Sequence, residues 1–381
     1  MRITSLLLFL ISFSLGYIFY ATFCTWIFFK KNGQGKKESG KALPPVSIIK
    51  PFSGLEDGTL GNFMSFCDQD YPDYEVIFSL SQKEELMISL LEDLKKLLPN
   101  RDIRWIIANQ NKGPNYKVGN LIGAVREAKY EILAISDGDM RVDRNYLKQV
   151  VRLLLQEKVG LVTCLYRGAH IQSIFSGLLS LTVQTDFIPN VLLDHRLEGI
   201  SYAFGATILT SKQVLASFGG LETLREYLAD DYQMGNQVHK KGYRICLSAY
   251  LVDHIFCKKS FRQYFLHHLR WAITQRVCRP IGYFASIITH GVFLALLFLI
   301  LKGFSLAAVA LFFFICGVRV LSVIFINKAV IHNGEVTRYF WLIPMNDLLN
   351  SVIWFLSFFI NTVRWKDRQF RVLKGGRMVE L

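Results

Sequence analysis

The sequence of 381 residues predicts an α/β domain flanked by apolar helices at both ends. Three patterns indicate this fold class: strands and helices alternate over residues 46–248, residues 4–29 carry no charge, and residues 281–326 are almost continuously apolar. Hydrophobic residues make up 51% of the chain and charged residues only 19%, below the roughly 25% of ordinary soluble domains. This composition excludes intrinsic disorder and argues against a wholly soluble protein.

The N-terminal stretch predicts a membrane anchor over residues 1–31. Its uncharged part, 4–29, is 26 residues long, and a helix of about 20 apolar residues crosses a bilayer core. A cleaved signal peptide is the alternative, but its apolar region is only about 7–15 residues long. Residues 32–45 form a predicted basic linker, and five lysines place this flank in the cytoplasm by the positive-inside rule: Lys30, Lys31, Lys36, Lys37 and Lys41.

Residues 46–278 are predicted to form the α/β domain. Five buried strands are expected, at 46–52, 74–81, 103–109, 131–136 and 160–166. Helices are expected between them, near 58–68, 84–98, 116–128 and 144–157. This alternation predicts a mostly parallel sheet with right-handed crossovers. Ligands of such sheets bind beyond the carboxyl ends of the strands, so chemistry is expected just after each strand.

Residues 279–361 predict a second membrane region, which a basic tail, 362–381, follows. Two apolar stretches, 281–301 and 304–326, form a predicted helical hairpin. The last stretch, 340–360, is interrupted by Pro344, Asn346, Asp347 and Asn350, so it either spans the bilayer or is re-entrant or interfacial. The second alternative keeps the basic tail cytosolic. Snorkelling or helix pairing explains Arg319 and His290, inside apolar stretches, better than an ion pathway does.

Net charge and cysteine content exclude two further classes. The formal net charge is +14, but the basic residues gather beside apolar stretches, which indicates anionic lipid headgroups rather than nucleic acid. The seven cysteines are scattered without a C-x-x-C pair, so neither a disulfide framework nor a zinc site is expected. Reduced, mostly structural thiols on a cytosolic face are the prediction.

The strongest chemical signal is the pair Asp137 and Asp139, directly after the predicted strand 131–136. Alternate residues of an extended chain point the same way, so both carboxylates could face one divalent ion. Hard oxygen ligands suit Mg²⁺ or Mn²⁺, which would also hold the phosphates of a nucleotide. A solvated turn is the alternative, because Asp and Gly are common turn residues.

Two further signals lie at predicted helix starts. Lys117 opens the helix after the third strand, where the positive end of a helix favours anions; an ordinary surface lysine is the alternative. Asp230 and Asp231 begin another helix. Asp230 is expected to cap that helix, which leaves Asp231 to act as a general base.

A fourth signal is HHLRWAITQR, residues 267–276, beside the membrane region. A basic, aromatic helix in this place is usually an interfacial anchor. Arg270 and Trp271, with Arg276 nearly two turns further on, could instead clamp a diphosphate leaving group.

With these four signals in order, the chain resembles the ceramide glucosyltransferase family of membrane-bound GT-A glycosyltransferases over nearly its whole length. The similar segments are VSIIKPFSGLE (46–56), FCDQDYPDYEVIFSL (66–80), the G-x-N-x-K-x-x-N-L match at 113–121 and the W-x-x-R-x-F-R-V match at 365–372. Within the family the chain is similar to a bacterial branch linked to hopanoid biosynthesis, on LVTCLYRG (161–168), YAFGATI (202–208), LADDYQMG (228–235) and HHLRW (267–271).

The resemblance implies roles for single residues. In the family pattern D, D, D, (Q/R)-x-x-R-W, Asp137 matches the second Asp and Asp139 extends it to a D-x-D. Asp231 matches the third Asp, the base, and Arg270 and Trp271 match the R-W pair. Two positions depart from the pattern: Glu84 or, in the better alignment, Glu85 stands where the first, donor-binding Asp is expected, and His267 replaces the Gln or Arg. Both departures favour the hopanoid-linked branch.

The implied reaction is an inverting transfer of glucose or N-acetylglucosamine from a UDP-sugar to the hydroxyl of a membrane lipid, either ceramide-type or hopanoid. It implies Mg²⁺ or Mn²⁺, no nucleic acid, and a catalytic domain on the cytoplasmic face of a bacterial inner membrane. A processive polysaccharide synthase is the nearest alternative, but two to four helices are too few for a polymer pore. A transporter is another, but residues 4–29 and 291–301 are almost purely apolar.

Overall fold

The computed structural model describes residues 2–33, 42–52, 54–108, 113–365 and 368–381. The chain forms two compact units whose segments alternate along the sequence. The sheet unit comprises Asn32–Tyr166, Ile200–Cys257 and Gly376–Leu381. The membrane unit comprises Met1–Lys31, Arg167–Gly199 and Lys258–Gly375, and so takes in two segments of the predicted 46–278 domain. Most of the predicted basic linker, 34–41, lies outside the described residues.

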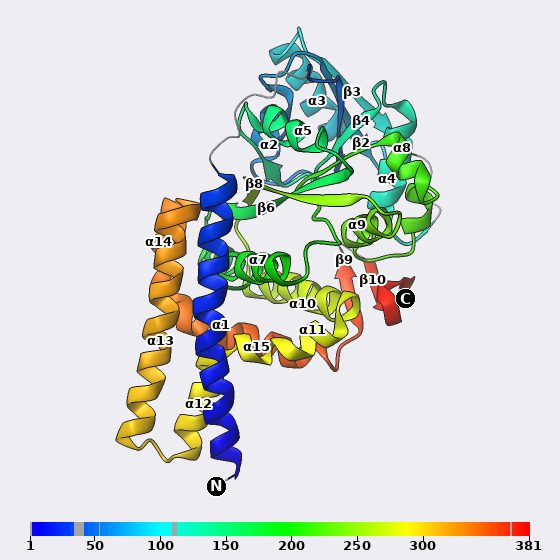
Figure 1. Cartoon of the computed structure of the whole chain (residues 1–381). Coiled ribbons are helices and arrows are strands. Elements are labelled where there is room, and N and C mark those ends of the chain that lie inside the picture. The colour runs from blue at the N-terminus through cyan, green and yellow to red at the C-terminus, as the bar shows by residue number, and fades with distance from the viewer. Residues whose placement is uncertain (1, 34–41, 53, 109–112, 366–367) are drawn as a thin grey trace. The chain divides into compact units, whose positions relative to one another are not determined.

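The sheet unit is built on an eight-stranded sheet with the order β3-β2-β1-β4-β7-β6-β8-β5 (Figure 1). Its strands are β1 Val46–Phe52, β2 Tyr74–Leu80, β3 Asp102–Ile107, β4 Ile132–Ile135, β5 Met140–Arg141, β6 Val159–Ala169, β7 Ile208–Ser211 and β8 Arg244–Ile255. All five predicted strands are present, with ends within three residues of the prediction.

The sheet is parallel in one half and antiparallel in the other. β1 pairs in parallel with β2 and β4, and β2 with β3, whereas β7 runs antiparallel to β4 and β6, and β5 to β8. The prediction of a parallel sheet therefore holds for β1 to β4. Every residue of β1 and β2 is buried, which explains why these strands are mostly apolar on both faces.

The four predicted helices of this domain are confirmed as α2 Thr59–Cys67, α3 Glu85–Leu97, α4 Tyr116–Glu127 and α5 Tyr146–Leu154. The second half adds α8 Lys212–Ser217, a 3₁₀ turn at Leu221–Leu224, α9 Asp230–Lys240 and the C-terminal strand β11 Met378–Glu380. β11 is tied into the unit because Met378 N donates to Glu226 O at 2.7 Å.

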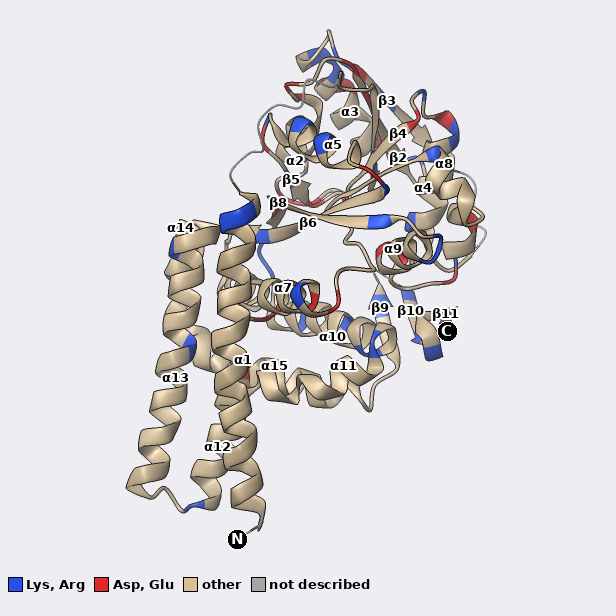
Figure 2. Cartoon of the chain, viewed as in Figure 1, with Lys and Arg blue, Asp and Glu red and all other residues tan. Residues whose placement is uncertain are grey.

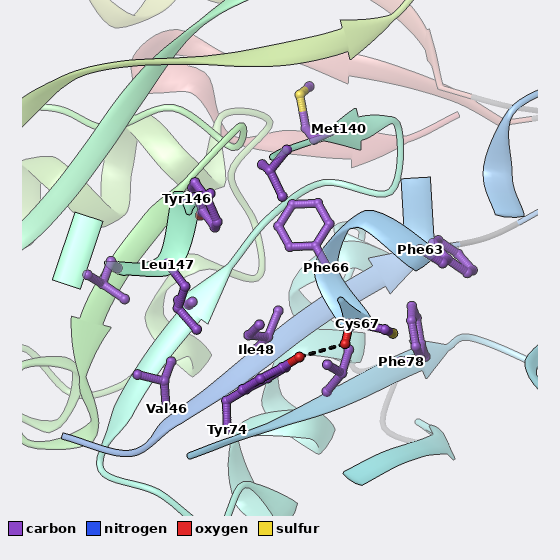
Figure 3. Packing of buried hydrophobic residues seen from close by; sticks show 14 of the residues in the cluster. Val46, Ile48, Phe63, Phe66, Cys67, Tyr74, Phe78, Met140, Tyr146 and Leu147 are labelled. Atoms are coloured by element: carbon purple, nitrogen blue, oxygen red, sulfur yellow. Dashed lines mark hydrogen bonds between the residues drawn. The ribbon is translucent and has the colours of Figure 1, made fainter. Parts of the chain in front are cut away.

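The core of the sheet unit lies between β1 and β2 on one side and α2 and α5 on the other (Figure 3). Phe63 of α2 packs its ring 4.5 Å from that of Phe78 and 4.7 Å from that of Phe52. The hydroxyl of Tyr74 donates to the carbonyl of Cys67 at 2.6 Å, so the one polar atom of this buried ring is satisfied. These contacts hold the carboxyl end of β1 rigidly beside α2.

The membrane unit begins with α1, Arg2–Asn32. Its other helices are α6 Ile174–Thr182, a π-helix at Val183–Phe187, α7 Ile188–Leu197, α10 Phe261–Cys278, α11 Pro280–Ala285, a 3₁₀ turn at Ser286–Thr289, α12 Gly291–Leu301, α13 Leu306–Ile326, a π-helix at Asn327–Ile331, α14 Gly334–Thr337, a 3₁₀ turn at Phe340–Leu342 and α15 Ile343–Ser357. Strands β9 Thr362–Trp365 and β10 Arg368–Val372 pair as an antiparallel hairpin within the predicted basic tail, and a 3₁₀ turn at Lys374–Gly376 follows.

Two helices among the described residues are long and apolar enough to cross a membrane, Ile3–Asn32 and Leu306–Ile331. A third candidate is the pair Pro280–Thr289 and Gly291–Leu301, which is bent by 58°. The predicted single span at 281–301 is thus broken, at His290. Figure 2 shows α1, α12 and α13 almost free of charged residues along their lengths, as spanning helices require.

The last predicted apolar stretch, 340–360, forms α15, which has 15 residues. About 20 residues are needed to cross a bilayer core, so α15 is too short to span it. Figure 1 shows α15 running across α1 and α13, which belong to the same unit, rather than alongside them. Of the two alternatives for this stretch, a re-entrant or interfacial segment fits its length.

Arg319 of α13 confirms the expectation of helix pairing. Its guanidinium bonds Asp347 of α15 at 2.8 Å and Asp186 of the first π-helix at 2.7 Å. The Arg319 side chain is only 4% exposed, so the pairing supplies the partners that a buried charge requires. His290, at the break before α12, lies 3.1 Å from the hydroxyl of Ser351 in α15.

Candidate active site

The carboxyl ends of β1, β2 and β4 meet at one edge of the sheet, and the predicted D-x-D turn lies there. β4 ends at Ile135, and the chain turns through Asp137, Gly138 and Asp139 into β5. A Cβ at Gly138 would come 3.1 Å from Cβ of Phe52, so the turn rests directly on the end of β1. The carboxylates of Asp137 and Asp139 are partly exposed, 32% and 43% respectively.

Lys117 lies at the centre of this edge. It is the second residue of α4, whose N-cap is Asn115, since the Asn115 side chain accepts a bond from Val118 N at 3.1 Å. Nζ of Lys117 contacts Oδ1 of Asp137 at 2.7 Å and Oδ2 of Asp230 at 3.0 Å. With its side chain only 17% exposed, Lys117 is not an ordinary surface lysine.

The charge of Lys117 is maintained by these carboxylates. Burial works to lower the pKa of Lys117, but the charges of Asp137, Asp230 and Asp231 outweigh it and raise that pKa well above its usual range. Two carboxylates therefore contact one ammonium, and the charge of Asp231 adds to theirs. The cluster has an excess of negative charge, as a site that receives a cation requires.

Asp230 and Asp231 begin α9 and point to different partners, as neighbours about 100° apart on a helix must. Asp230 is buried and faces Lys117, and its Oδ1 is 3.4 Å from the amide nitrogen of Asn115. The expectation that Asp230 caps the helix is wrong. The N-cap residue is Ala229, whose methyl side chain cannot accept a bond, and the carboxylate of Asp230, the first residue of the helix, contacts the Lys117 ammonium.

Asp231 is held by two backbone N–H groups. Gly205 N donates to its Oδ2 at 2.8 Å, and Tyr232 N donates to its Oδ1 at 2.8 Å. Burial, followed by the charge of Asp230, raises the pKa of Asp231 to about 6, although Lys117 opposes the shift. A carboxylate of this kind can accept a proton near neutral pH.

Gly205 joins the D-x-D turn to α9. Its carbonyl accepts from Asp137 N at 2.9 Å, while its N–H binds Asp231. A Cβ at this position would lie 2.2 Å from Oδ2 of Asp137, so only glycine allows so close an approach. The residue lies in the YAFGATI segment, where the sequence shows a glycine but not its partners.

Asp139 faces the other side of the turn, toward β8. Its Oδ2 is 3.0 Å from Nε2 of His254. The prediction that Asp137 and Asp139 share one ion stays a prediction. In the described ranges no group of three or more His, Cys, Asp or Glu side chains is arranged to hold a metal. Mg²⁺ and its like are commonly bound by one or two carboxylates together with water and substrate phosphates, and these two partly exposed carboxylates fit that donor set.

The other predicted ligands belong to α3 of the sheet unit and to α10 of the membrane unit. Glu85 is exposed in the first turn of α3, beyond the carboxyl end of β2. His267, Arg270 and Trp271 belong to α10 in the membrane unit. There the ring of His267 lies 4.4 Å from that of Trp271, and the Arg270 guanidinium lies over the ring of Trp365 at 5.8 Å. Arg276 bonds Asn361 at 2.5 Å.

Sequence reasoning missed several residues of the sheet unit that contact the acidic turn or Asp231, among them Lys50, Gly205 and His254. Only Lys50 carried a visible signal, because it is a charged residue in the middle of the apolar strand β1. Its side chain is fully buried, and its ammonium lies 3.7 Å from the ring centre of Phe66. Burial lowers the pKa of Lys50 to about 7, although Asp139 and Asp137 oppose the shift.

The chain thus combines a half-parallel α/β sheet, an acidic cluster at the strand ends and candidate membrane helices. The chain belongs to glycosyl transferase family 21, whose family model matches residues 6–378.

Among its relatives, Ceramide glucosyltransferase 1 of Caenorhabditis elegans is 24% identical over 352 residues, which cover 90% of this chain and 75% of that protein. Ceramide glucosyltransferase 3 of the same organism is 26% identical over 217 residues, 56% of this chain and 47% of that protein. Among solved structures, a mannosyltransferase from Pyrobaculum calidifontis in complex with GDP-Man and Mn²⁺ is similar with a TM-score of 0.46 and 15% identity, covering 90% of this chain and 98% of that one. The placement in a hopanoid-linked branch stays a prediction.

Proposed function

We propose that this protein transfers a hexose, glucose or N-acetylglucosamine, from a UDP-sugar to the hydroxyl of a membrane lipid, with inversion at the anomeric carbon. Membership of a glycosyltransferase family supports the reaction class. The names of its relatives, which are ceramide glucosyltransferases, support a lipid acceptor and glucose. The observation that carries the mechanism is the Asp231 carboxylate, held by Gly205 N–H beside Asp137 and Lys117.

In this proposal Asp231 is the general base. It takes the proton of the lipid hydroxyl while the hydroxyl oxygen forms a bond to the anomeric carbon. The bond from that carbon to the phosphate oxygen breaks, and its electron pair leaves with UDP. Attack opposite the leaving group inverts the anomeric configuration. The pKa of about 6 supports this role, because Asp231 is then mostly ionised at neutral pH yet basic enough to accept a proton.

The leaving diphosphate carries the charge that the rest of the cluster must balance. Asp137 and Asp139 would hold a divalent ion, which when bound offsets charge on the diphosphate. Lys117 keeps Asp137 and Asp230 in place and adds a cation within the same cluster. Glu85, His267, Arg270 and Trp271 enter the proposal through the sequence resemblance alone, Glu85 as a ligand of the nucleoside and the others as ligands of the diphosphate.

The test is a transfer assay with purified protein in detergent. UDP-glucose, UDP-N-acetylglucosamine and GDP-mannose are offered separately, each with a short-chain ceramide or a hopanoid polyol, and release of nucleoside diphosphate is measured. We expect lipid-dependent release from a UDP-sugar, and proton NMR should show a β-linked product from the α-linked donor. Release from GDP-mannose alone, or an α-linked product, contradicts the proposal.

Chelation and one substitution test the acidic turn in the same assay. Removal of divalent ions with EDTA should abolish transfer, and Mg²⁺ or Mn²⁺ should restore it. Asp139→Ala should lose transfer while the protein still folds, because a partly exposed carboxylate at a strand end contributes little to the core. Near-normal activity of Asp139→Ala in EDTA shows that the turn holds no catalytic metal.

A further inference from the structure

The backbone of the Asp137–Asp139 turn is held at every carbonyl. Lys50 Nζ donates to the carbonyl of Asp137. Asn62 of α2 approaches the carbonyl of Gly138 with its amide nitrogen at 3.4 Å, and Ile255 N donates to the carbonyl of Asp139 at 2.9 Å. Strands β1 and β8 and helix α2 thus supply donors to all three carbonyls of the turn. The side chains of Asp137 and Asp139 contact Lys117 and His254.

Among these donors, the Lys50 amine is the one that burial in an apolar core does not explain. It is fully buried in β1, where a side chain with an ionisable amine costs far more than an apolar one of the same length. Its other contacts are the hydroxyl of Ser136 at 3.3 Å and the ring face of Phe66 at 3.7 Å. Methionine would fill the same space without this cost, so the amine needs a functional explanation.

We infer that Lys50 is a positioning residue that fixes the Asp137–Asp139 turn for sugar transfer. Its amine binds the carbonyl of the residue whose carboxylate contacts Lys117, and so ties the turn to the end of β1. This role rests on the proposed function as regards transfer, but the anchoring of the turn can be measured without any reaction. The Lys50 side chain is fully buried and its amine binds the Asp137 carbonyl, so it acts through Asp137 rather than as a catalytic residue.

The test compares Lys50→Met with a matched control, Lys212→Met. Lys212 belongs to the same unit and also donates its ammonium to a backbone carbonyl, that of Ala128 at 2.5 Å, near the other end of β4. Hydrogen–deuterium exchange of the peptide that covers 136–141 reports on the turn directly. We expect exchange there to rise at least about tenfold in Lys50→Met and to stay unchanged in Lys212→Met.

Kinetics and thermal unfolding complete the test. We expect kcat to fall about tenfold to a hundredfold in Lys50→Met, as small misplacements of catalytic groups do, with KM for the lipid within about twofold of the parent. Lys212→Met should keep normal kcat. If Lys50→Met does not fold, Ser136→Ala removes the other side-chain hydrogen-bond partner of the amine and should raise exchange in the same peptide by a smaller factor.

Unchanged exchange over 136–141 in a folded Lys50→Met protein overturns the inference, as does a normal kcat. If the parent protein transfers no sugar from any donor, the proposed function fails instead. The exchange comparison then still decides whether Lys50 anchors the turn.

Discussion

Gly205 donates its backbone N–H to Oδ2 of Asp231 at 2.8 Å, and this bond sets the position of the proposed base. The carbonyl of the same residue accepts from Asp137 N at 2.9 Å. One peptide segment without a side chain thus connects the acid that begins α9 with the acidic turn after β4. The relative placement of Asp231 and Asp137 depends on this loop rather than on either acid alone.

Gly205→Ala should therefore impair transfer more than stability. The new Cβ would fall 2.2 Å from Oδ2 of Asp137, so the loop or the carboxylate must move. A shift of about 1 Å at a reacting group can cost about 10²-fold in rate, and we expect a fall of kcat of that order. Gly282→Ala is the matched control, since nothing lies within 4 Å of its new Cβ. Equal kcat for the two variants contradicts the close approach.

Comparison of Asp231→Asn with Asp230→Asn should distinguish the general base from the carboxylate that holds Lys117. Asp231→Asn keeps the shape of the side chain but cannot accept a proton, so kcat should fall by roughly 10² or more while UDP-sugar binding is nearly intact. Asp230→Asn removes one of two carboxylates from Lys117 and should reduce kcat less. Calorimetry with UDP and steady-state kinetics measure both effects. A normal kcat in Asp231→Asn, or loss of the chemical step only in Asp230→Asn, rules out this assignment.

The pH profile of kcat should fall on the acid side of about pH 6. Asp231 acts only when ionised, and burial together with Asp230 raises its pKa to about 6, so protonation below that pH removes the base. The charges around Asp231 also determine in which direction two substitutions should shift its pKa. Asp230→Asn removes a negative neighbour and should move the inflection to lower pH, whereas Lys117→Met removes a positive one and should move it to higher pH. An inflection that neither variant moves excludes Asp231 as the titrating group.

Arg319→Met should destabilise the membrane unit strongly. Two carboxylates, Asp186 and Asp347, would lose their shared cation inside the protein, and breaking a buried ion pair costs about 3–5 kcal/mol. Arg279→Met is the matched control, because Arg279 also binds two carboxylates but is 36% exposed, where ion pairs are worth about 0–1 kcal/mol. Thermal unfolding in detergent should show a much larger fall for Arg319→Met; similar falls contradict the burial argument.

Cysteine labelling should place the two ends of α1 on opposite sides of the membrane. Cysteine at Gly33, next to the lysines that end α1, should react from the cytosolic side, as the positive-inside rule requires. Lys302→Cys, between α12 and α13, should react from outside, because Leu7 near the start of α1 packs in one cluster with Leu299 and Ala308 beside that turn. Labelling of Gly33→Cys only from outside reverses the orientation and removes access to cytosolic UDP-sugar.

The sequence by itself determined the elements and the kind of chemistry. Strands such as Val46–Phe52 are buried on both faces, so their mostly apolar composition identifies them from the sequence alone. The apolar lengths of 4–29 and 304–326 predict membrane helices. The sequence also predicted site residues from their positions. Asp137 directly follows a strand, and Lys117 and Asp231 lie in the first turns of helices. The structure brings Lys117 within 3.0 Å of both Asp137 and Asp230.

Only the tertiary structure decided how those groups are held. Capping is a local property, yet Asp230 is the first residue of α9 rather than its cap, and its carboxylate contacts Lys117, 113 positions earlier. Gly205, Lys50 and the Arg319–Asp186 pair owe their roles to partners far away in sequence, and a lone glycine or charge does not reveal such a partner. Local patterns specify strands and helices through periodicity and hydrophobic length. The contacts that position a catalytic carboxylate arise only when the chain brings distant segments within hydrogen-bond distance.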